Sequence, residues 1–73
     1  MLEVVKQIIE KQTYQDGDII TKVEVIDGEK LQVSSNNSCH LQDLLSSVIN
    51  VRDVYLKEFS PIKGGSRFTI SVH

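Results

Sequence analysis

The residues of this chain that could do nucleophilic or metal chemistry are few and are not spaced for it. Cys39 and His40 adjoin near the start of an expected helix. Adjacent helical residues point about 100° apart, so this thiol and imidazole do not face each other as a nucleophile and its base must. One cysteine and two histidines also leave a four-ligand zinc site incomplete. We expect no catalytic residue, no metal site and a solvent-exposed His40.

The stretch Lys63-Gly64-Gly65-Ser66 is a second candidate, because glycine-rich loops can cradle phosphate. It leads into an expected strand rather than a helix, so it lacks the aligned amides and the dipole of a phosphate site. The acidic residues show no pair placed for general acid and base work. We expect no cofactor, and we interpret the glycines as a chain reversal whose approach Pro61 stiffens.

Length and composition indicate a single small domain over residues 1–73. Apolar residues make up 40% and charged residues 25% of the sequence, which are ordinary values for a globular domain. The apolar runs are far shorter than the roughly 20 residues that span a bilayer, and the N-terminus lacks a signal-peptide pattern. We therefore expect no membrane contact, and the single cysteine favours a cytoplasmic location.

The net charge of −2 hides an asymmetry between the two parts of the chain. Residues 1–50 carry four lysines against eight acidic residues, whereas residues 51–73 carry four cations against two acidic residues. These cations are Arg52, Lys57, Lys63 and Arg67. Only this C-terminal segment could attract a polyanion, and a pI near 5.5 is low for a dedicated nucleic-acid-binding domain.

Two segments have the apolar spacing of amphipathic helices. In residues 1–12 and 34–50 the apolar positions are Leu2, Val5, Ile8 and Ile9, then Leu41, Leu44, Leu45 and Val48. Asp16-Gly17 predicts a reversal after the first helix. Ser38 or Asn37 is the expected N-cap of the second helix, and Asn50 is its expected left-handed stop.

The segment IITKVEVIDGEKLQV predicts a β-hairpin. A strict two-residue turn at Asp27-Gly28 would set apolar residues opposite polar ones on the same face. Pairing Val25 with Leu31 and Val23 with Val33 keeps one face apolar instead. That register needs a three-residue loop or a bulge next to Val25, and we expect the longer loop.

The C-terminal segment VYLKEFSPIKGGSRFTISVH predicts a second hairpin, because apolar and polar residues alternate on both sides of the glycines. Pairing Leu56 with Phe68 and Val54 with Ile70 aligns the apolar residues. Residues 59–65 then form a long loop.

The expected order is therefore helix, hairpin, helix, hairpin. We predict a two-layer α+β fold of αββαββ order, with a mainly antiparallel four-stranded sheet and both helices packed on one face. The core of so short a chain is thin and its edge strands are exposed, so we also expect a homodimer.

The functional hypothesis is based on a pair of aromatic residues. In the predicted register Tyr55 and Phe59 share the sheet face opposite Leu56, near Lys63 and Arg67. Aromatic residues and arginine are enriched at protein interfaces. We therefore predict that Tyr55, Phe59, Lys63 and Arg67 bind an unidentified protein partner.

The predicted function is a small non-enzymatic protein-interaction module of adaptor or inhibitor type, and the short chain suggests a bacterial or phage origin. The alternative is a nucleic-acid-binding protein that uses the basic C-terminal hairpin, with Arg52, Lys57, Lys63 and Arg67 as the phosphate contacts. The salt dependence of binding distinguishes these two hypotheses, because a complex held by phosphate contacts weakens steeply between about 50 and 200 mM salt.

Overall fold

A computed structural model of the chain describes residues 2–13 and 18–73, which form helices and strands in the predicted αββαββ order. The elements are α1 Leu2–Gln12, β1 Thr21–Asp27, β2 Lys30–Ser35, α2 Ser38–Val48, β3 Val54–Ile62 and β4 Gly65–Val72. The predicted reversal at Asp16-Gly17 lies outside the described residues.

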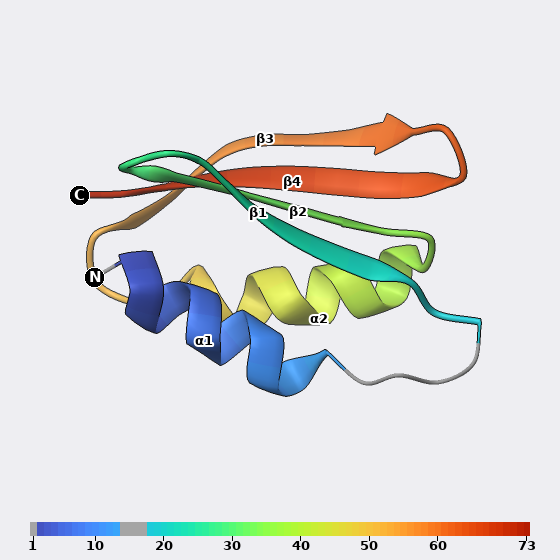
Figure 1. Cartoon of the computed structure of the whole chain (residues 1–73), viewed down its shortest axis with the longest axis horizontal. Helices are drawn as coiled ribbons and strands as arrows, with labels where there is room; N and C mark the ends of the chain where they lie inside the picture. Colours follow the sequence, from blue (N-terminus) through green and yellow to red (C-terminus); the bar gives the residue numbers. More distant parts are fainter. Residues whose placement is uncertain (1, 14–17) are drawn as a thin grey trace.

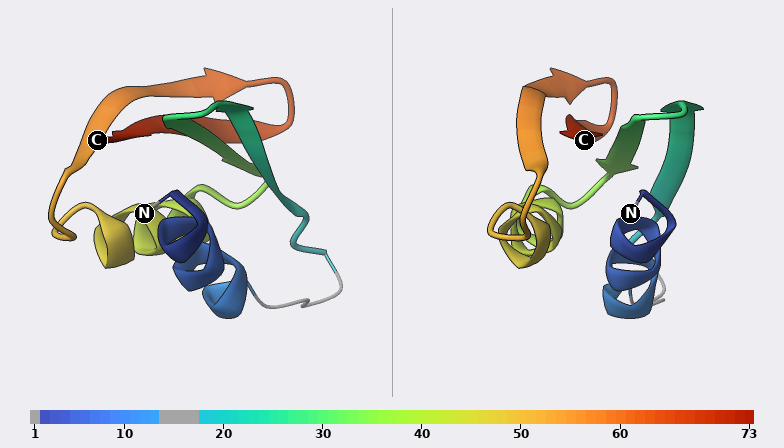
Figure 2. Two further views of the ribbon diagram at one scale, coloured as in Figure 1. Left: turned by 60° about the vertical axis from the view of Figure 1, so that its left-hand side comes forward. Right: turned by 90° about the vertical axis from the view of Figure 1, so that its left-hand side faces the viewer.

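The strands form one antiparallel sheet with the order β1-β2-β4-β3 (Figure 1). Both helices lie on the same face of the sheet, as the right-hand view of Figure 2 shows. Helix α1 packs against β1 and β2, and α2 packs against β2 and β4. The predicted α+β fold is confirmed, and β1 and β3 are the edge strands.

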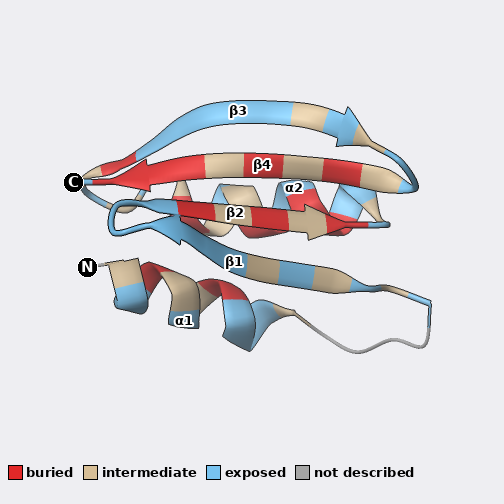
Figure 3. Cartoon of the chain, turned by 45° about the horizontal axis from the view of Figure 1, so that its top comes forward, coloured by how far each residue is buried: buried red, intermediate tan, exposed pale blue. Residues whose placement is uncertain are grey.

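The hydrophobic core lies between the helices and the two central strands (Figure 3). Strand β2 contributes Leu31 and Val33, and β4 contributes Phe68 and Ile70, all fully buried. The helices cover these side chains with Val5, Ile9, Leu41, Leu44 and Val48, which recur at helical spacing. Because the helices cover the centre of the sheet, the edge strands stay largely exposed.

The first hairpin has the predicted register, in which Val23 lies opposite Val33 and Val25 lies opposite Leu31. The predicted longer loop is wrong. The turn has two residues, Gly28-Glu29, and the register is kept by a β-bulge after Val25. The bulge supplies the extra residue that the alternation of apolar side chains requires.

The N-cap of α2 is Asn37, one of the two predicted residues, whose side-chain oxygen accepts a hydrogen bond of 2.9 Å from the backbone N–H of His40. The predicted left-handed stop at Asn50 is wrong. Ile49 caps the helix in a right-handed conformation, and Asp53, with φ of 67°, is the one non-glycine residue with positive φ among those described. The chain therefore turns three residues later than expected, directly before β3.

Helices α1 and α2 have eleven residues each. A helix needs roughly 20 residues to cross the hydrocarbon core of a bilayer. In the described ranges, no helix is long and apolar enough for that.

Candidate functional site

The two adjacent glycines at the turn between β3 and β4 are required for different reasons. The predicted loop over residues 59–65 is wrong, because Ile62 pairs with Gly65 across a two-residue turn at Lys63-Gly64. Gly64 has φ of 83°, a left-handed conformation that glycine adopts without strain. A Cβ on Gly65 would collide with the carbonyl oxygen of Ser35. One glycine therefore turns the chain, and the other lets β4 begin against the end of β2.

Pro61 lies inside β3 rather than in a loop, opposite Ser66. Proline has no N–H to donate to a ladder, so within a sheet it is found mainly on edge strands. The position of β3 at the edge of the sheet is therefore compatible with Pro61.

A β-bulge at Lys57 sets the register of the second hairpin. Leu56 lies opposite Ile70 rather than opposite Phe68, so the predicted register is wrong by two residues along β4. After the bulge, Phe59 lies opposite Phe68. The extra residue reverses which positions of β3 face the helices.

This bulge separates the two predicted aromatic contacts. Residues that lie directly opposite each other in an antiparallel pair project from the same face. Phe59 lies opposite the buried Phe68 and so faces the helices, whereas Tyr55 lies opposite Ser71 and faces the outer surface. The predicted shared face for Tyr55 and Phe59 is wrong, and Phe59 shares its face with Leu56 instead.

Leu56 and Phe59 form a strip on the helix-facing side of β3, named here the β3 apolar strip. They stay 43% and 38% exposed, because β3 is an edge strand and the helices pack mainly on β2 and β4. The Phe59 ring stacks on the Phe68 ring, with centroids 6.4 Å apart and an interplanar angle of 14°. One side of the Phe59 ring is thus fixed against the core while much of the side chain stays accessible.

The outer surface near Tyr55 is already occupied by contacts within the chain. The Tyr55 ring lies 5.7 Å from the His73 ring, and His73 Nε2 shares a hydrogen bond of 2.8 Å with Ser71 Oγ. His73 Nδ1 also lies 3.6 Å from a carboxylate oxygen of Glu29. Tyr55 and His73 together cover Ser71, which is buried although it faces outward.

The predicted basic residues do not gather in one place. Arg67 Nη2 lies 3.6 Å from the Glu58 carboxylate, which offsets its charge. Arg52 precedes β3 and Lys63 follows it, so the nine residues of this strand lie between them. At about 3.3 Å per residue, the strand holds these two cations more than about 25 Å apart along the hairpin.

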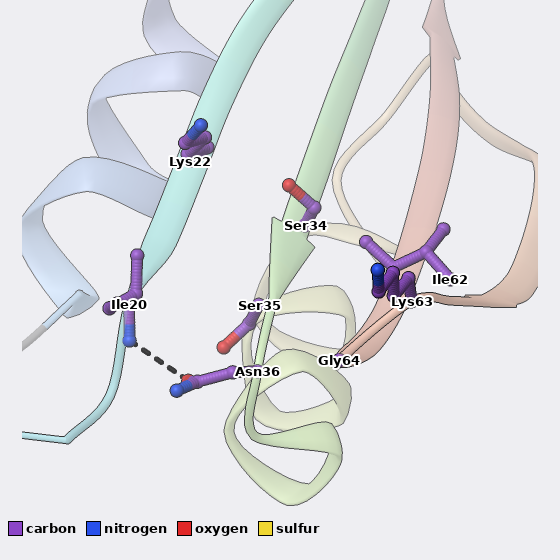
Figure 4. Close-up of a pocket in the computed structure, with 8 residues that line it drawn as sticks. All are labelled: Ile20, Lys22, Ser34, Ser35, Asn36, Ile62, Lys63 and Gly64. Atoms are coloured by element: carbon purple, nitrogen blue, oxygen red, sulfur yellow. Dashed lines mark hydrogen bonds between the residues drawn. The ribbon is translucent and has the colours of Figure 1, made fainter.

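A shallow hollow of about 240 Å³ lies at one end of the outer face, next to the β3–β4 turn. Lys22 and Lys63 stand on either side of Ser34 in this hollow (Figure 4). The wall at Asn36 is fixed, because its side-chain oxygen accepts a hydrogen bond of 2.9 Å from the backbone N–H of Ile20. Both lysines are exposed, so water and salt screen their charges. The hollow is a largely apolar recess whose two cations are exposed.

Lys22 was not predicted from the sequence as a lining residue of this hollow. The correctly predicted register of the first hairpin already indicated its position. Pairing Val23 with Val33 sets Lys22 opposite Ser34, and Ser34 lies opposite Arg67 on the next strand.

Cys39 and His40 lie in different environments at the start of α2. Cys39 is exposed, whereas His40 is only 4% exposed, so the prediction that His40 is solvated is wrong. His40 precedes Leu44 by four residues, which places it on the buried stripe of the helix. In residues 2–13 and 18–73, no three His, Cys, Asp or Glu side chains form a group that could hold a metal ion.

Comparisons with protein-family models, with curated proteins and with solved structures found no match to this chain. Its function is therefore inferred from the geometry of the described residues.

Proposed function

We propose that this chain is a small non-enzymatic protein-interaction module, of adaptor or inhibitor type, that acts in the cytoplasm and binds a partner protein through the β3 apolar strip. The observation that supports it most is the half-exposed ring of Phe59, held against the buried ring of Phe68 at the edge of the sheet. Aromatic side chains that are fixed before binding contribute apolar area at a low cost in conformational entropy.

The charge beside the strip indicates which kind of partner segment it would favour. Lys57 is exposed between Leu56 and Phe59. An apolar segment that carries acidic side chains would bury its apolar groups against the strip and place a carboxylate near Lys57. Of the four predicted contact residues, we retain Phe59. Tyr55 and Arg67 project from the opposite face, where Lys63 lines the hollow.

Nucleic-acid binding is the weaker proposal on this geometry. Arg52 and Lys63 lie at opposite ends of β3, and the charge of Arg67 is partly offset by Glu58. A nucleic-acid backbone would contact these cations one at a time. Its affinity for this chain would therefore be little higher than its affinity for any protein with an exposed lysine.

Capture of partners from a lysate of the expressing cells, with and without nuclease, tests the proposal. Leu56→Ser and Lys57→Glu change the strip, while Arg52→Glu is a matched charge reversal outside it. We expect a protein that survives nuclease treatment, is retained by Arg52→Glu and is lost with both strip variants. Retention by every variant would exclude the strip, and loss on nuclease treatment would favour the nucleic-acid alternative.

A further inference from the structure

The two edge strands of the sheet differ in how well they are protected against pairing with another strand. Edge strands are commonly protected by proline, by bulges and by charged side chains. Strand β3 contains Pro61 and has its bulge at Lys57, within the strand. Strand β1 has no proline, and its bulge lies at Ile26, next to the turn. Residues 21–25 of β1 therefore form a regular stretch at the sheet edge.

The backbone of this stretch has hydrogen-bonding groups that face out of the sheet. Asn36 N–H donates to the carbonyl oxygen of Ile20 at 3.2 Å. In an antiparallel ladder, bonded and non-bonded positions alternate, so Lys22 and Glu24 direct their backbone groups toward β2. The N–H and C=O groups of Thr21, Val23 and Val25 then point away from the sheet, where a further strand would bond to them.

The sequence of the exposed stretch is nearly symmetric about Val23. Residues 20–26 read Ile-Thr-Lys-Val-Glu-Val-Ile, so a second copy that runs antiparallel presents the same pattern. With Val23 opposite Val23 of the second copy, Lys22 lies opposite Glu24 of the second copy, and this contact occurs twice. Opposite charges at directly opposed positions stabilise strand pairing.

The neighbouring two-fold registers are disfavoured by the same charges. A two-fold axis through Lys22 would place two lysines opposite each other, and an axis through Glu24 would place two glutamates opposite each other. Like charges directly opposed destabilise a strand pair. The register centred on Val23 is therefore selected over both neighbours.

Exposed apolar side chains lie along the same edge. Ile20, Val25 and Ile26 are 63%, 43% and 49% exposed. In the register centred on Val23, Thr21 lies opposite Val25 of the second copy, and Ile20 and Ile26 lie just beyond this regular stretch at its two ends. Pairing would remove part of this apolar area from water.

We propose that two copies of this chain associate through β1, antiparallel and centred on Val23, to form one continuous sheet about a two-fold axis. The β3 apolar strip lies on the other edge of the sheet and stays free in this dimer. The dimer and the proposed partner contact therefore use separate surfaces, and each can fail without the other.

Sedimentation of the full chain over a range of concentrations tests the dimer at about 50 mM salt. The wild type is expected to shift from 8.2 kDa toward twice that mass as its concentration rises. Lys22→Glu and Glu24→Lys each replace two favourable cross-strand contacts with two like-charge contacts, so each should weaken the dimer roughly tenfold or more. The double variant Lys22→Glu/Glu24→Lys restores opposite charges and should recover dimerisation.

Mixing the two single variants gives a sharper readout, because their charges complement each other across the edge. Lys22→Glu and Glu24→Lys should form a heterodimer more readily than either forms a homodimer. Lys57→Glu is the matched control, since it changes the net charge as Lys22→Glu does but lies on β3. It should dimerise like the wild type and show no preference for Glu24→Lys. A monomer at all concentrations would overturn the proposal, as would a dimer that is insensitive to the single reversals or is lost in Lys57→Glu.

Discussion

The ring of Phe59 lies nearly parallel to the ring of Phe68, 6.4 Å from it, although only Phe68 is buried. This contact exists because the bulge at Lys57 turns Phe59 toward the helices. Without that extra residue, Phe59 would project from the polar outer face and β3 would have no apolar strip. The bulge thus brings Phe59 into contact with the core, while the strip stays partly exposed because β3 is an edge strand.

Replacement of Phe59 by alanine should destabilise the domain although the residue is partly exposed. The substitution removes the ring contact with Phe68, and we expect a loss of about 1–3 kcal/mol in the free energy of unfolding, below the roughly 3–5 kcal/mol typical of a fully buried ring. Tyr55→Ala should cost less, because Tyr55 contacts His73 at the surface. Urea denaturation of both variants measures the difference, and an equal loss would contradict the assignment of faces.

The three described glycines should tolerate alanine to different degrees. Gly65→Ala should be the most disruptive, because the new methyl group meets backbone atoms of Ser35 and Asn36. Gly64→Ala should cost about 1–2 kcal/mol, since alanine is strained at a φ of 83°. Gly28→Ala meets no atom within 4 Å and should change stability by less than about 0.5 kcal/mol. Thermal unfolding of the three variants ranks them.

Loss of the N-cap of α2 should be measurable against a close control. Asn37→Ala removes the oxygen that accepts a hydrogen bond from His40 N–H, and we expect a cost of about 1 kcal/mol. Asn50→Ala should be nearly neutral, because Asn50 does not have the left-handed conformation in which asparagine is favoured. Equal effects of the two substitutions in chemical denaturation would contradict this description of the helix ends.

The sequence predicts the register of the first hairpin because the alternation of apolar residues outweighs the turn signal there. A strict turn at Asp27-Gly28 would set apolar residues opposite polar ones, whereas alternation favours the pairing of Val23 with Val33, which the structure has. In the second hairpin the alternation of apolar residues is interrupted, so the register is harder to predict. The helix-facing apolar residues of β3 are at positions 54, 56 and 59, and the three-residue step between the last two reflects the bulge. A single inserted residue leaves composition and turn chemistry unchanged, so the prediction of the faces failed.

The remaining features differ in whether the sequence alone can predict them. The burial of His40 follows from helical spacing relative to Leu44, a local signal that the sequence contains. The near-symmetry around Val23 is also visible in the sequence, but its significance depends on strand order. Only the order β1-β2-β4-β3 shows that this stretch lies at an edge where a second copy could pair.

Site-specific photocrosslinking from β3 tests the proposed partner contact most directly. A photoreactive phenylalanine derivative at position 59 faces the helix side, and the same derivative at position 55 faces the outer side of the same strand. In lysate of the expressing cells, we expect a protein adduct from position 59 that Lys57→Glu abolishes, and none from position 55. Adducts of equal yield from both positions, or an adduct from position 55 alone, would contradict the β3 apolar strip as the binding surface.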